Sequence, residues 1–107
     1  VRVPVLRSHS ESITITFEEG VDVNVDKARE VLGDFENVTV LDDMSKNQYP
    51  MPIIATDTDE TYVGRIRKDL FSNNILHLWG VADQVRVGAA TNAVRIAQKW
   101  IKLEENA

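Results

Sequence analysis

The sequence contains no cysteine and only two histidines, His9 and His77. A disulfide framework and a thiolate zinc site are therefore excluded, and we expect no metal site. No apolar run approaches the roughly 20 residues that a membrane-spanning helix needs, and no signal peptide is visible. The glycine-rich motifs that cradle phosphates, G-x-G-x-x-G and the P-loop, are also missing.

Positive charge is scarce as well. The chain has 12 basic and 17 acidic residues, a net charge of -5 and a pI near 4.9. Nucleic acids and anionic membranes are bound by basic faces, so we expect neither as a partner. The 107 residues suffice for one domain with a buried core. The chain begins at Val1, without an initiating methionine and directly on a functional-looking motif, which is typical of a fragment.

That motif places Arg2, Arg7 and His9 within nine residues of an apolar, strand-like run. A guanidinium matches a carboxylate or a phosphate, and an imidazole titrates near neutrality and can pass a proton. Together they suit chemistry on a small acidic substrate. The alternative is that the arginines pair with surface carboxylates and the histidine is structural.

Strand geometry tests this grouping. On a regular strand Arg7 and His9 share a face, whereas Arg2, seven residues before His9, does not. A shared substrate would therefore require a bend, for which Pro4 is the plausible place. Ser8 and Ser10 fall opposite His9, so no serine nucleophile is expected there.

Hydrophobic periodicity predicts the remaining elements. Ala28, Val31, Leu32 and Phe35 lie at helical spacing, after a cap at Asn24 or Asp26 and with Gly33 able to end the helix. We predict strands at residues 12–18, 38–41, 61–67 and 75–82, and helices near 24–35 and 88–103, the last with an alanine-rich apolar face. His77, in the middle of a strand, is interpreted as structural.

Several polar groups have two interpretations each. Asp42 and Asp43 could bind a metal, but a turn or helix cap is the ordinary role of such a pair. Arg65, Arg67 and Lys68 could form an anion patch or a solvated face. Alternation along the strand puts Tyr62, Gly64 and Ile66 on one face, opposite Val63, Arg65 and Arg67.

The proline-containing stretch 44–59 predicts an extended loop with a polyproline-like middle. Its apolar residues Met51, Ile53 and Ile54 could pack on their own domain or on a neighbouring chain. Gly88 could mark an anion site at a helix N-terminus, although an ordinary helix start is the simpler interpretation.

Four segments together resemble the aspartate-semialdehyde dehydrogenase family. They are R-V-P-V-L-R-S-H-S-E-S-I-T at the start, N-Q-Y-P-M-P at 47–52, Y-V-G-R-I-R-K-D at 62–69, and W-G-V-A-D-Q at 79–84 with G-A-A-T-N-A at 88–93. The resemblance spans nearly the whole chain but only the C-terminal part of the family's length.

The resemblance implies an α+β fold: a mixed or antiparallel sheet with helices on one face, like the glyceraldehyde-3-phosphate dehydrogenase C-terminal domain, plus a long C-terminal helix. Residues 1–87 would belong to the catalytic and dimerisation domain, and residues 88–107 would form a helix returning to the coenzyme domain. A homodimer or higher homo-oligomer in the cytoplasm is expected.

The family reduces aspartyl phosphate to aspartate semialdehyde with NADPH, on the route to lysine, threonine and methionine. The resemblance implies that His9 is the general acid/base, that Arg2 binds the substrate carboxylate and that Gln84 contacts NADP. The family's nucleophilic cysteine and coenzyme loop are absent, so this chain alone should be inactive. The rivals are a non-catalytic homodimerising module and a small-anion-binding module using Arg2, Arg7 and His9.

Overall fold

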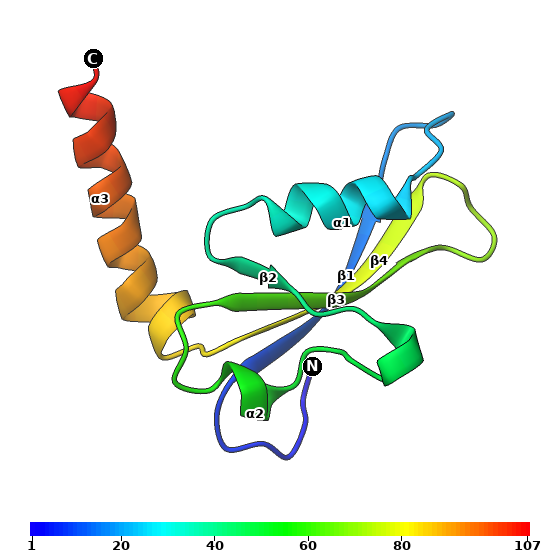
Figure 1. Ribbon diagram of the computed structural model, residues 1–107, viewed down its shortest axis with the longest axis horizontal. Coiled ribbons are helices and arrows are strands. Elements are labelled where there is room, and N and C mark those ends of the chain that lie inside the picture. Colours follow the sequence, from blue (N-terminus) through cyan, green and yellow to red (C-terminus); the bar gives the residue numbers. More distant parts are fainter.

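The computed structural model describes all 107 residues, and four strands form a single sheet in the order β1-β4-β3-β2 (Figure 1). The strands are β1 His9–Thr16, β2 Val38–Val40, β3 Thr61–Lys68 and β4 Ile75–Ala82. β4 runs antiparallel to both β1 and β3, whereas β2 runs parallel to β3, so the sheet is mixed. The predicted α+β class, with its C-terminal helix, is confirmed.

The helices are α1 Val25–Gly33, α2 Pro52–Ala55 and α3 Thr91–Glu105, with a 3-10 turn η1 at Met44–Lys46 and a π-helical turn η2 at Arg86–Ala90. None of these helices combines the length and the apolar composition that a membrane-spanning helix requires.

Helix α1 covers one face of the sheet. Of the two predicted caps, Asn24 is the one that caps it, by accepting the Lys27 N–H at 2.9 Å. Ala28 and Leu32 pack on the core, which is formed by Val63, Ile66, Leu76 and Leu78. Each such buried aliphatic side chain contributes about 1.5–3 kcal/mol. The prediction that Phe35 shares this face is wrong, because the helix ends at Gly33 and Phe35 lies beyond it, exposed.

The first eight residues do not form the predicted strand. The chain bends at Pro4, where a bend was anticipated, and Ser8 has a φ of 75°, so regular pairing starts only at His9. Arg7 and His9 therefore do not share a strand face. The physical reason is that Arg7 pairs with Asp57 and Asp83, which pull it out of strand geometry.

A β-bulge changes the phase of β3. Gly64 pairs with Trp79 but Arg67 pairs with His77, so Arg65 and Ile66 together oppose a single residue of β4. Val63 and Ile66 consequently face the same core, and the predicted regular alternation along β3 is wrong after Gly64.

The stretch 44–59 is also more structured than predicted. Instead of a polyproline-like middle, it contains η1 and α2, with Pro52 in the first turn of α2, where a missing N–H has no consequence. Pro50 and Ala55 are buried against the sheet. Met51, Ile53 and Ile54 remain exposed, so they do not complete their own domain's core.

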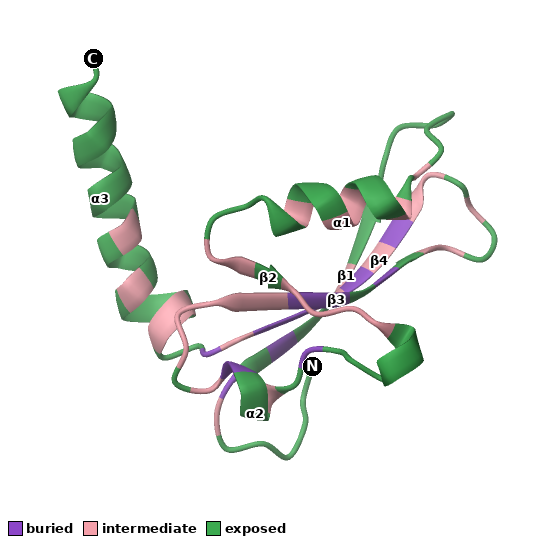
Figure 2. Cartoon of the chain, in the orientation of Figure 1, coloured by how far each residue is buried: buried purple, intermediate pink, exposed green.

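Helix α3 stands away from the sheet (Figures 1 and 2). It begins three residues later than predicted, because the π-helical turn η2 precedes it. None of its residues is buried.

Candidate functional site: a cavity beside His9 and Gln84

A cavity of about 250 Å³ lies where β1 begins and β4 ends. His9 pairs with Ala82 across these strands, and the segment after β4 folds over them. The lining comprises His9, Glu11, Ile13, Thr61, Val63, Gly80, Val81, Ala82, Gln84, Val87 and Gly88. The structure thus brings together two of the three predicted site residues, His9 and Gln84, although 75 positions separate them in the sequence.

His9 is half-exposed and pairs with Glu11, with 3.3 Å between its Nε2 and the carboxylate Oε1. The two residues are two positions apart on β1 and so share one face. A carboxylate on one ring nitrogen orients the imidazole and leaves Nδ1 free to exchange a proton. Sequence reasoning missed Glu11, although its i, i+2 spacing from His9 could have indicated it.

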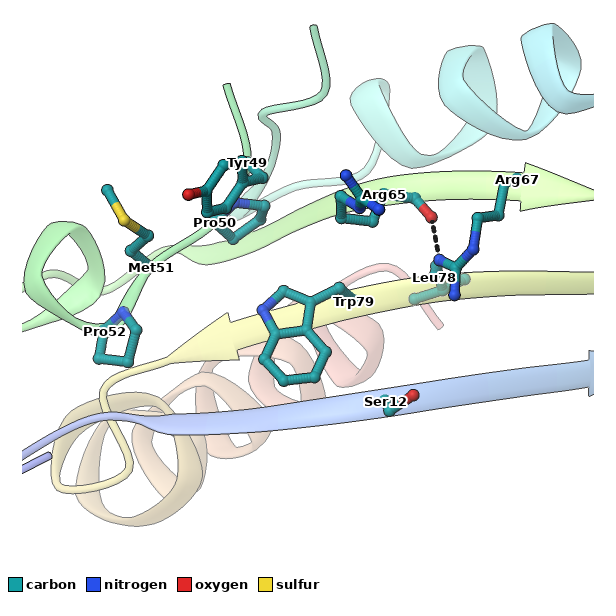
Figure 3. A pocket seen from close by; sticks show the side chains of 9 residues that line it. All are labelled: Ser12, Tyr49, Pro50, Met51, Pro52, Arg65, Arg67, Leu78 and Trp79. Atoms are coloured by element: carbon teal, nitrogen blue, oxygen red, sulfur yellow. Dashed lines mark hydrogen bonds between the residues drawn. The ribbon is translucent and has the colours of Figure 1, made fainter. Parts of the chain in front are cut away.

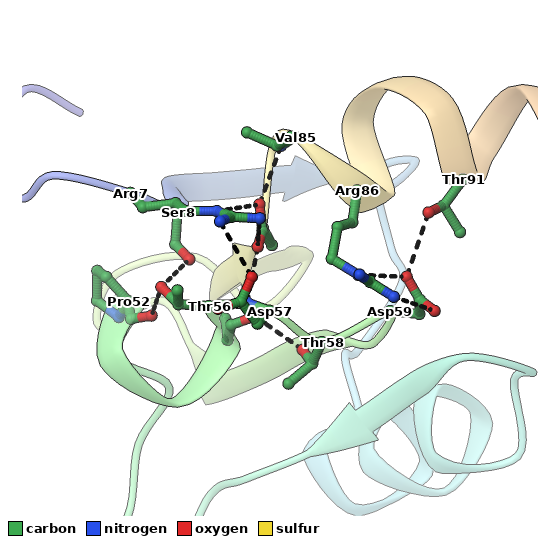
Figure 4. A network of polar contacts seen from close by, with 12 residues as sticks. Arg7, Ser8, Pro52, Thr56, Asp57, Thr58, Asp59, Val85, Arg86 and Thr91 are labelled. Carbon is green, nitrogen blue, oxygen red and sulfur yellow. Dashed lines mark hydrogen bonds and ion pairs between the residues drawn. The ribbon is translucent and has the colours of Figure 1, made fainter.

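Gln84 is exposed in the turn after β4, and its neighbour Asp83 holds that turn in place. The Asp83 carboxylate is fully buried and accepts hydrogen bonds from the N–H groups of Asp57, at 2.7 Å, and Val85, at 3.0 Å. Arg7 completes the set with an ion pair at 2.9 Å (Figure 4). Arg7 is therefore a structural residue and is not free to bind a small anion.

These contacts set the charge state of Asp83. Burial is the largest influence and would raise the pKa of the Asp83 carboxyl, but the Asp57 N–H, Arg7 and the Val85 N–H together outweigh it. The pKa therefore lies below its usual value, and the carboxylate stays ionised.

A second network joins the sheet to the C-terminal helix. Asp59 accepts from Arg86 through two bonds of 2.8 and 3.0 Å, and from the Thr91 hydroxyl at 3.2 Å (Figure 4). Arg95 donates to the Asp59 carbonyl at 2.7 Å. Hydrogen bonding by Arg86 is the main cause that lowers the pKa of Asp59, and the same pair raises the pKa of Arg86. The network fixes the π-helical turn that carries Gly88.

Arg2 does not line this cavity. It lies in the irregular opening segment, exposed, and its side chain makes no hydrogen bond or ion pair. The Val1 nitrogen donates to the Ser10 carbonyl at 3.1 Å, so the opening segment loops back toward the start of β1. Arg2 is left unpaired near this end of the sheet.

The other polar candidates have structural roles. Ser8 is buried and bonds to Thr56 at 2.8 Å, so it forms no nucleophilic pair with His9. Asp43 caps η1 through Ser45. Asp42 instead accepts from the backbone of β3, so the two aspartates serve different sites.

His77 lies on the opposite face of the sheet, held by Asp69 at 2.7 Å and by Thr14 at 2.9 Å. The hydrogen bond from His77 is the main cause that lowers the pKa of Asp69. The structural interpretation of His77 is consistent with these contacts.

A larger cavity of about 550 Å³ opens on that same face (Figure 3). Its lining is aromatic and cationic, including Tyr49, Trp79, Arg65 and Arg67. It contains no histidine and no carboxylate, whereas the smaller cavity contains His9 and Glu11. The smaller cavity is therefore the better candidate for proton-transfer chemistry.

Comparison with known proteins adds to this geometry. A family model described as "Semialdehyde dehydrogenase, dimerisation domain" matches residues 1–87. Aspartate-semialdehyde dehydrogenase of Campylobacter jejuni is 62% identical over 104 residues, and that of Helicobacter pylori 55% identical over 102. These alignments cover 97% and 95% of this chain but only 30% and 29% of the relatives.

Solved structures of aspartate-semialdehyde dehydrogenases have the same fold as this chain. Aspartate semialdehyde dehydrogenase II from Vibrio cholerae, in complex with ASA, superposes with a TM-score of 0.82 at 30% identity, covering 94% of this chain and 29% of that one. A probable aspartate-semialdehyde dehydrogenase from Pseudomonas aeruginosa gives a TM-score of 0.81 at 34% identity, covering 92% and 28%. The chain therefore spans about 30% of the length of its curated relatives.

Proposed function

This chain belongs to the semialdehyde dehydrogenase dimerisation-domain family, and from that premise we propose that it is the C-terminal portion of an NADP-dependent aspartate-semialdehyde dehydrogenase. The longer enzyme converts aspartyl phosphate to aspartate semialdehyde, for lysine, threonine and methionine synthesis in the cytoplasm. The observation that carries the proposal is the cavity in which His9 and Gln84 meet.

His9 is the proton carrier in this proposal. Reduction of an acyl phosphate passes through tetrahedral species whose oxygen gains and loses negative charge, and an imidazole can supply and remove the matching proton. Glu11 holds one ring nitrogen, so the other is directed to the reacting group. The thiol nucleophile comes from a part of the longer protein outside this chain, which has no cysteine.

Arg2 binds the substrate's carboxylate. Its guanidinium has no internal partner, in contrast to Arg7, which two aspartates occupy. An unpaired guanidinium offers a fork of donors that a carboxylate accepts in bidentate fashion. This assignment removes Arg7 from the small-anion alternative and leaves Arg2 as its remaining arginine.

Gln84 contacts the coenzyme, whose reduced form, NADPH, would supply hydride when bound. The cavity fits only part of such a coenzyme: its lining has no lysine or arginine, and its 250 Å³ is below the range of ordinary ligand pockets. Gln84 and the open Gly88 thus suit an uncharged part of the coenzyme. The phosphates are bound elsewhere in the longer enzyme.

We assign residues 1–87 to the catalytic and dimerisation domain and residues 88–107 to a connecting helix. The apolar side chains of α3 are exposed, among them Val94, Ile96 and Trp100. In the longer enzyme these side chains pack on the coenzyme domain.

The test is His9→Asn in the full-length protein. Asparagine keeps a similar size and hydrogen bonding but cannot titrate, so kcat should fall about 10²–10⁴-fold while the substrate KM changes little. In the same steady-state assays, Arg2→Leu should raise the KM for the acyl phosphate, and Gln84→Ala should raise the KM for NADPH.

His77→Asn is the matched control, compared at equal oligomer content, and should keep kcat within a few-fold. Unchanged kcat in His9→Asn would contradict the catalytic proposal and favour a homodimerising module without chemistry. If the protein shows no turnover and Arg2→Leu abolishes phosphate binding, the anion-binding module is favoured.

A further inference from the structure

Both cavity residues of the proposed function lie where regular pairing of the sheet ends. His9 is the first residue of β1, and Gln84 lies two positions beyond Ala82, the last residue of β4. The ends of a hydrogen-bonded ladder open more readily than its middle. Strand pairing alone therefore leaves the two side chains loosely placed relative to each other, unless another contact holds this end together.

A planar ion pair provides that contact. Arg7 Nε donates to one oxygen of Asp83 at 3.2 Å, and a terminal guanidinium nitrogen pairs with the other oxygen at 2.9 Å. The remaining terminal nitrogen pairs with Asp57 at 3.0 Å, and the Asp57 N–H donates to Asp83 at 2.7 Å. Arg7, Asp57 and Asp83 form a closed set, which we call the clamp (Figure 4). A guanidinium that binds a carboxylate through two bonds fixes its orientation as well as its distance.

The clamp fixes the backbone on both sides of Gln84. Asp83 precedes Gln84, and its carboxylate also accepts the N–H of Val85, which follows Gln84, at 3.0 Å. The resulting Asx-type turn spans Gln84. The Asp83 side chain is fully buried, so solvent does not compete for these bonds. The direction in which Gln84 projects therefore depends on the clamp.

The clamp also sets the direction of the chain just before His9. Ser8, between Arg7 and His9, has a φ of 75°, and Asp57 has a φ of 64°. Non-glycine residues rarely adopt this left-handed region, and such strain is concentrated at functional sites. The buried Ser8 hydroxyl bonds to Thr56, next to Asp57, at 2.8 Å (Figure 4). Turned in this way, the chain directs Arg7 into the clamp and leaves His9 to line the cavity.

None of the three clamp residues lines the cavity itself. We propose that the clamp is a positioning device: it fixes the His9 imidazole relative to the Gln84 side chain and so aligns proton transfer with the bound coenzyme. Arg7 and Asp83 act through these two residues and touch neither substrate nor coenzyme. The inference rests on the proposed function of His9 and Gln84, and it gives Arg7, excluded above as an anion ligand, a role in the same reaction.

The test is Arg7→Lys in the full-length protein. Lysine keeps the positive charge that the buried Asp83 carboxylate needs, so the variant should fold, but an ammonium group cannot reproduce the planar fork that joins Asp83 and Asp57. A misplacement of about 1 Å at an active site can cost about 10²-fold in rate. We therefore expect kcat to fall about tenfold or more and the Kd for NADP, measured by titration calorimetry, to rise about tenfold.

Two double-mutant cycles distinguish positioning from general stabilisation. In a His9→Asn background, Arg7→Lys should cost little further kcat, because the group that it aligns is gone, yet it should still raise the Kd for NADP. In a Gln84→Ala background it should leave the Kd unchanged and still lower kcat. A residue that only stabilised the fold would reduce the amount of active enzyme by the same factor in every background and would change no Kd.

Arg29→Lys is the matched control. The Arg29 and Arg7 side chains are both 36% exposed, and each pairs with an almost fully buried aspartate, Asp42 and Asp83 respectively. Arg29 lies on α1 and does not line the cavity. Arg29→Lys should therefore lower the melting temperature about as much as Arg7→Lys and leave kcat and the Kd for NADP unchanged.

Asp57→Asn is a second, milder variant. It removes only the exposed ion pair of the clamp and keeps the N–H that Asp83 accepts, so it should fold. Both kcat and the Kd for NADP should change in the same direction as in Arg7→Lys, by smaller factors.

Wild-type kcat and Kd in folded Arg7→Lys would overturn the proposal, as would equal effects of Arg7→Lys in all backgrounds. If the lysine variant does not fold, wild-type values in Asp57→Asn have the same meaning. The proposed function fails separately: it is refuted if His9→Asn and Gln84→Ala keep wild-type values, whatever Arg7→Lys does. Strong effects of those two variants beside a normal Arg7→Lys would refute the clamp alone.

Discussion

At the scale of single residues, aspartates organise this molecule. Asp42, Asp59, Asp69 and Asp83 each accept hydrogen bonds at or beyond a strand end, and each pairs with an arginine or a histidine from elsewhere in the chain. The side chains of Asp42 and Asp83 are buried, and a buried carboxylate is tolerated only when its oxygens are satisfied in this way. Several of the acidic residues therefore stabilise the fold through ion pairs within the chain, and these aspartates are distinct from any ligand site.

Gly64 is the residue at which the structure predicts the clearest effect of a substitution on stability. A Cβ there would lie 2.2 Å from the Leu41 carbonyl oxygen and 2.5 Å from Pro50 Cδ. Backbone and proline atoms cannot swing aside, so Gly64→Ala should lower the free energy of unfolding by about 1–3 kcal/mol or more. Urea unfolding of the full-length protein measures this.

Gly33→Ala is the matched control for that substitution. The nearest atom to its added Cβ is 3.9 Å away, and alanine is favoured over glycine in a helix by about 0.5–1 kcal/mol. Gly33→Ala should therefore be neutral or stabilising. Equal effects of the two variants would mean that close packing at Gly64 is not the cause.

At the scale of elements, the π-helical turn and α3 depend on one aspartate. Asp59 holds Arg86 in η2, Thr91 at the start of α3 and, through its carbonyl, Arg95 one turn later. π-helical turns are rare and are frequently found at functional sites. Here the turn places Gly88 over the cavity of His9 and Gln84, so the anchor of a helix also shapes the candidate site.

This anchor should be sensitive to acid. The folded pKa of Asp59 is depressed, mainly by hydrogen bonds from Arg86, so its stabilising effect is full above the unfolded pKa of about 3.9 and is lost as pH falls through the folded value. Asp59→Asn should therefore destabilise the full-length protein at pH 6, by an amount that shrinks below about pH 4. Urea unfolding across that range measures it.

Asp34→Asn is the comparison, because Asp34 follows α1 and forms no ion pair. Its effect should be small at pH 6. A destabilisation by Asp59→Asn that stays constant from pH 6 down to pH 3 would contradict the role of the carboxylate charge.

At the scale of the whole molecule, the chain is less compact than its size allows. Its radius of gyration is 15.7 Å, against about 13 Å for a typical domain of about 100 residues. The difference comes from α3, which projects from the sheet with its apolar residues exposed (Figure 2). Helix α3 therefore presents an apolar surface to other parts of a larger assembly.

The isolated 107 residues should therefore have no dehydrogenase activity. The proposed chemistry needs a thiol nucleophile, and the chain contains no cysteine. Assays of NADPH oxidation with aspartyl phosphate should give the rate of the buffer alone. A turnover that disappears in His9→Asn would show that this chain carries a complete active site and would refute the assignment as a portion of a larger enzyme.

Local pattern in the sequence determined much of this protein. The N-cap at Asn24, the apolar run of β4 and the mixed α+β class depend on neighbours in the chain, and short-range rules describe them. The family resemblance was likewise carried by contiguous motifs. The absence of cysteine alone excluded disulfides and thiol chemistry within these residues.

Tertiary structure decided the rest, because the deciding partners lie far apart in the sequence. Arg7 leaves its expected strand to reach Asp83, 76 residues away, and Asp42 shifts the phase of β3 by binding Arg65, 23 residues away. His9 meets Gln84 only because β1 pairs with β4. Hydrophobic periodicity cannot predict such contacts, because the donors that a buried carboxylate binds are close to it in space and distant from it in the sequence.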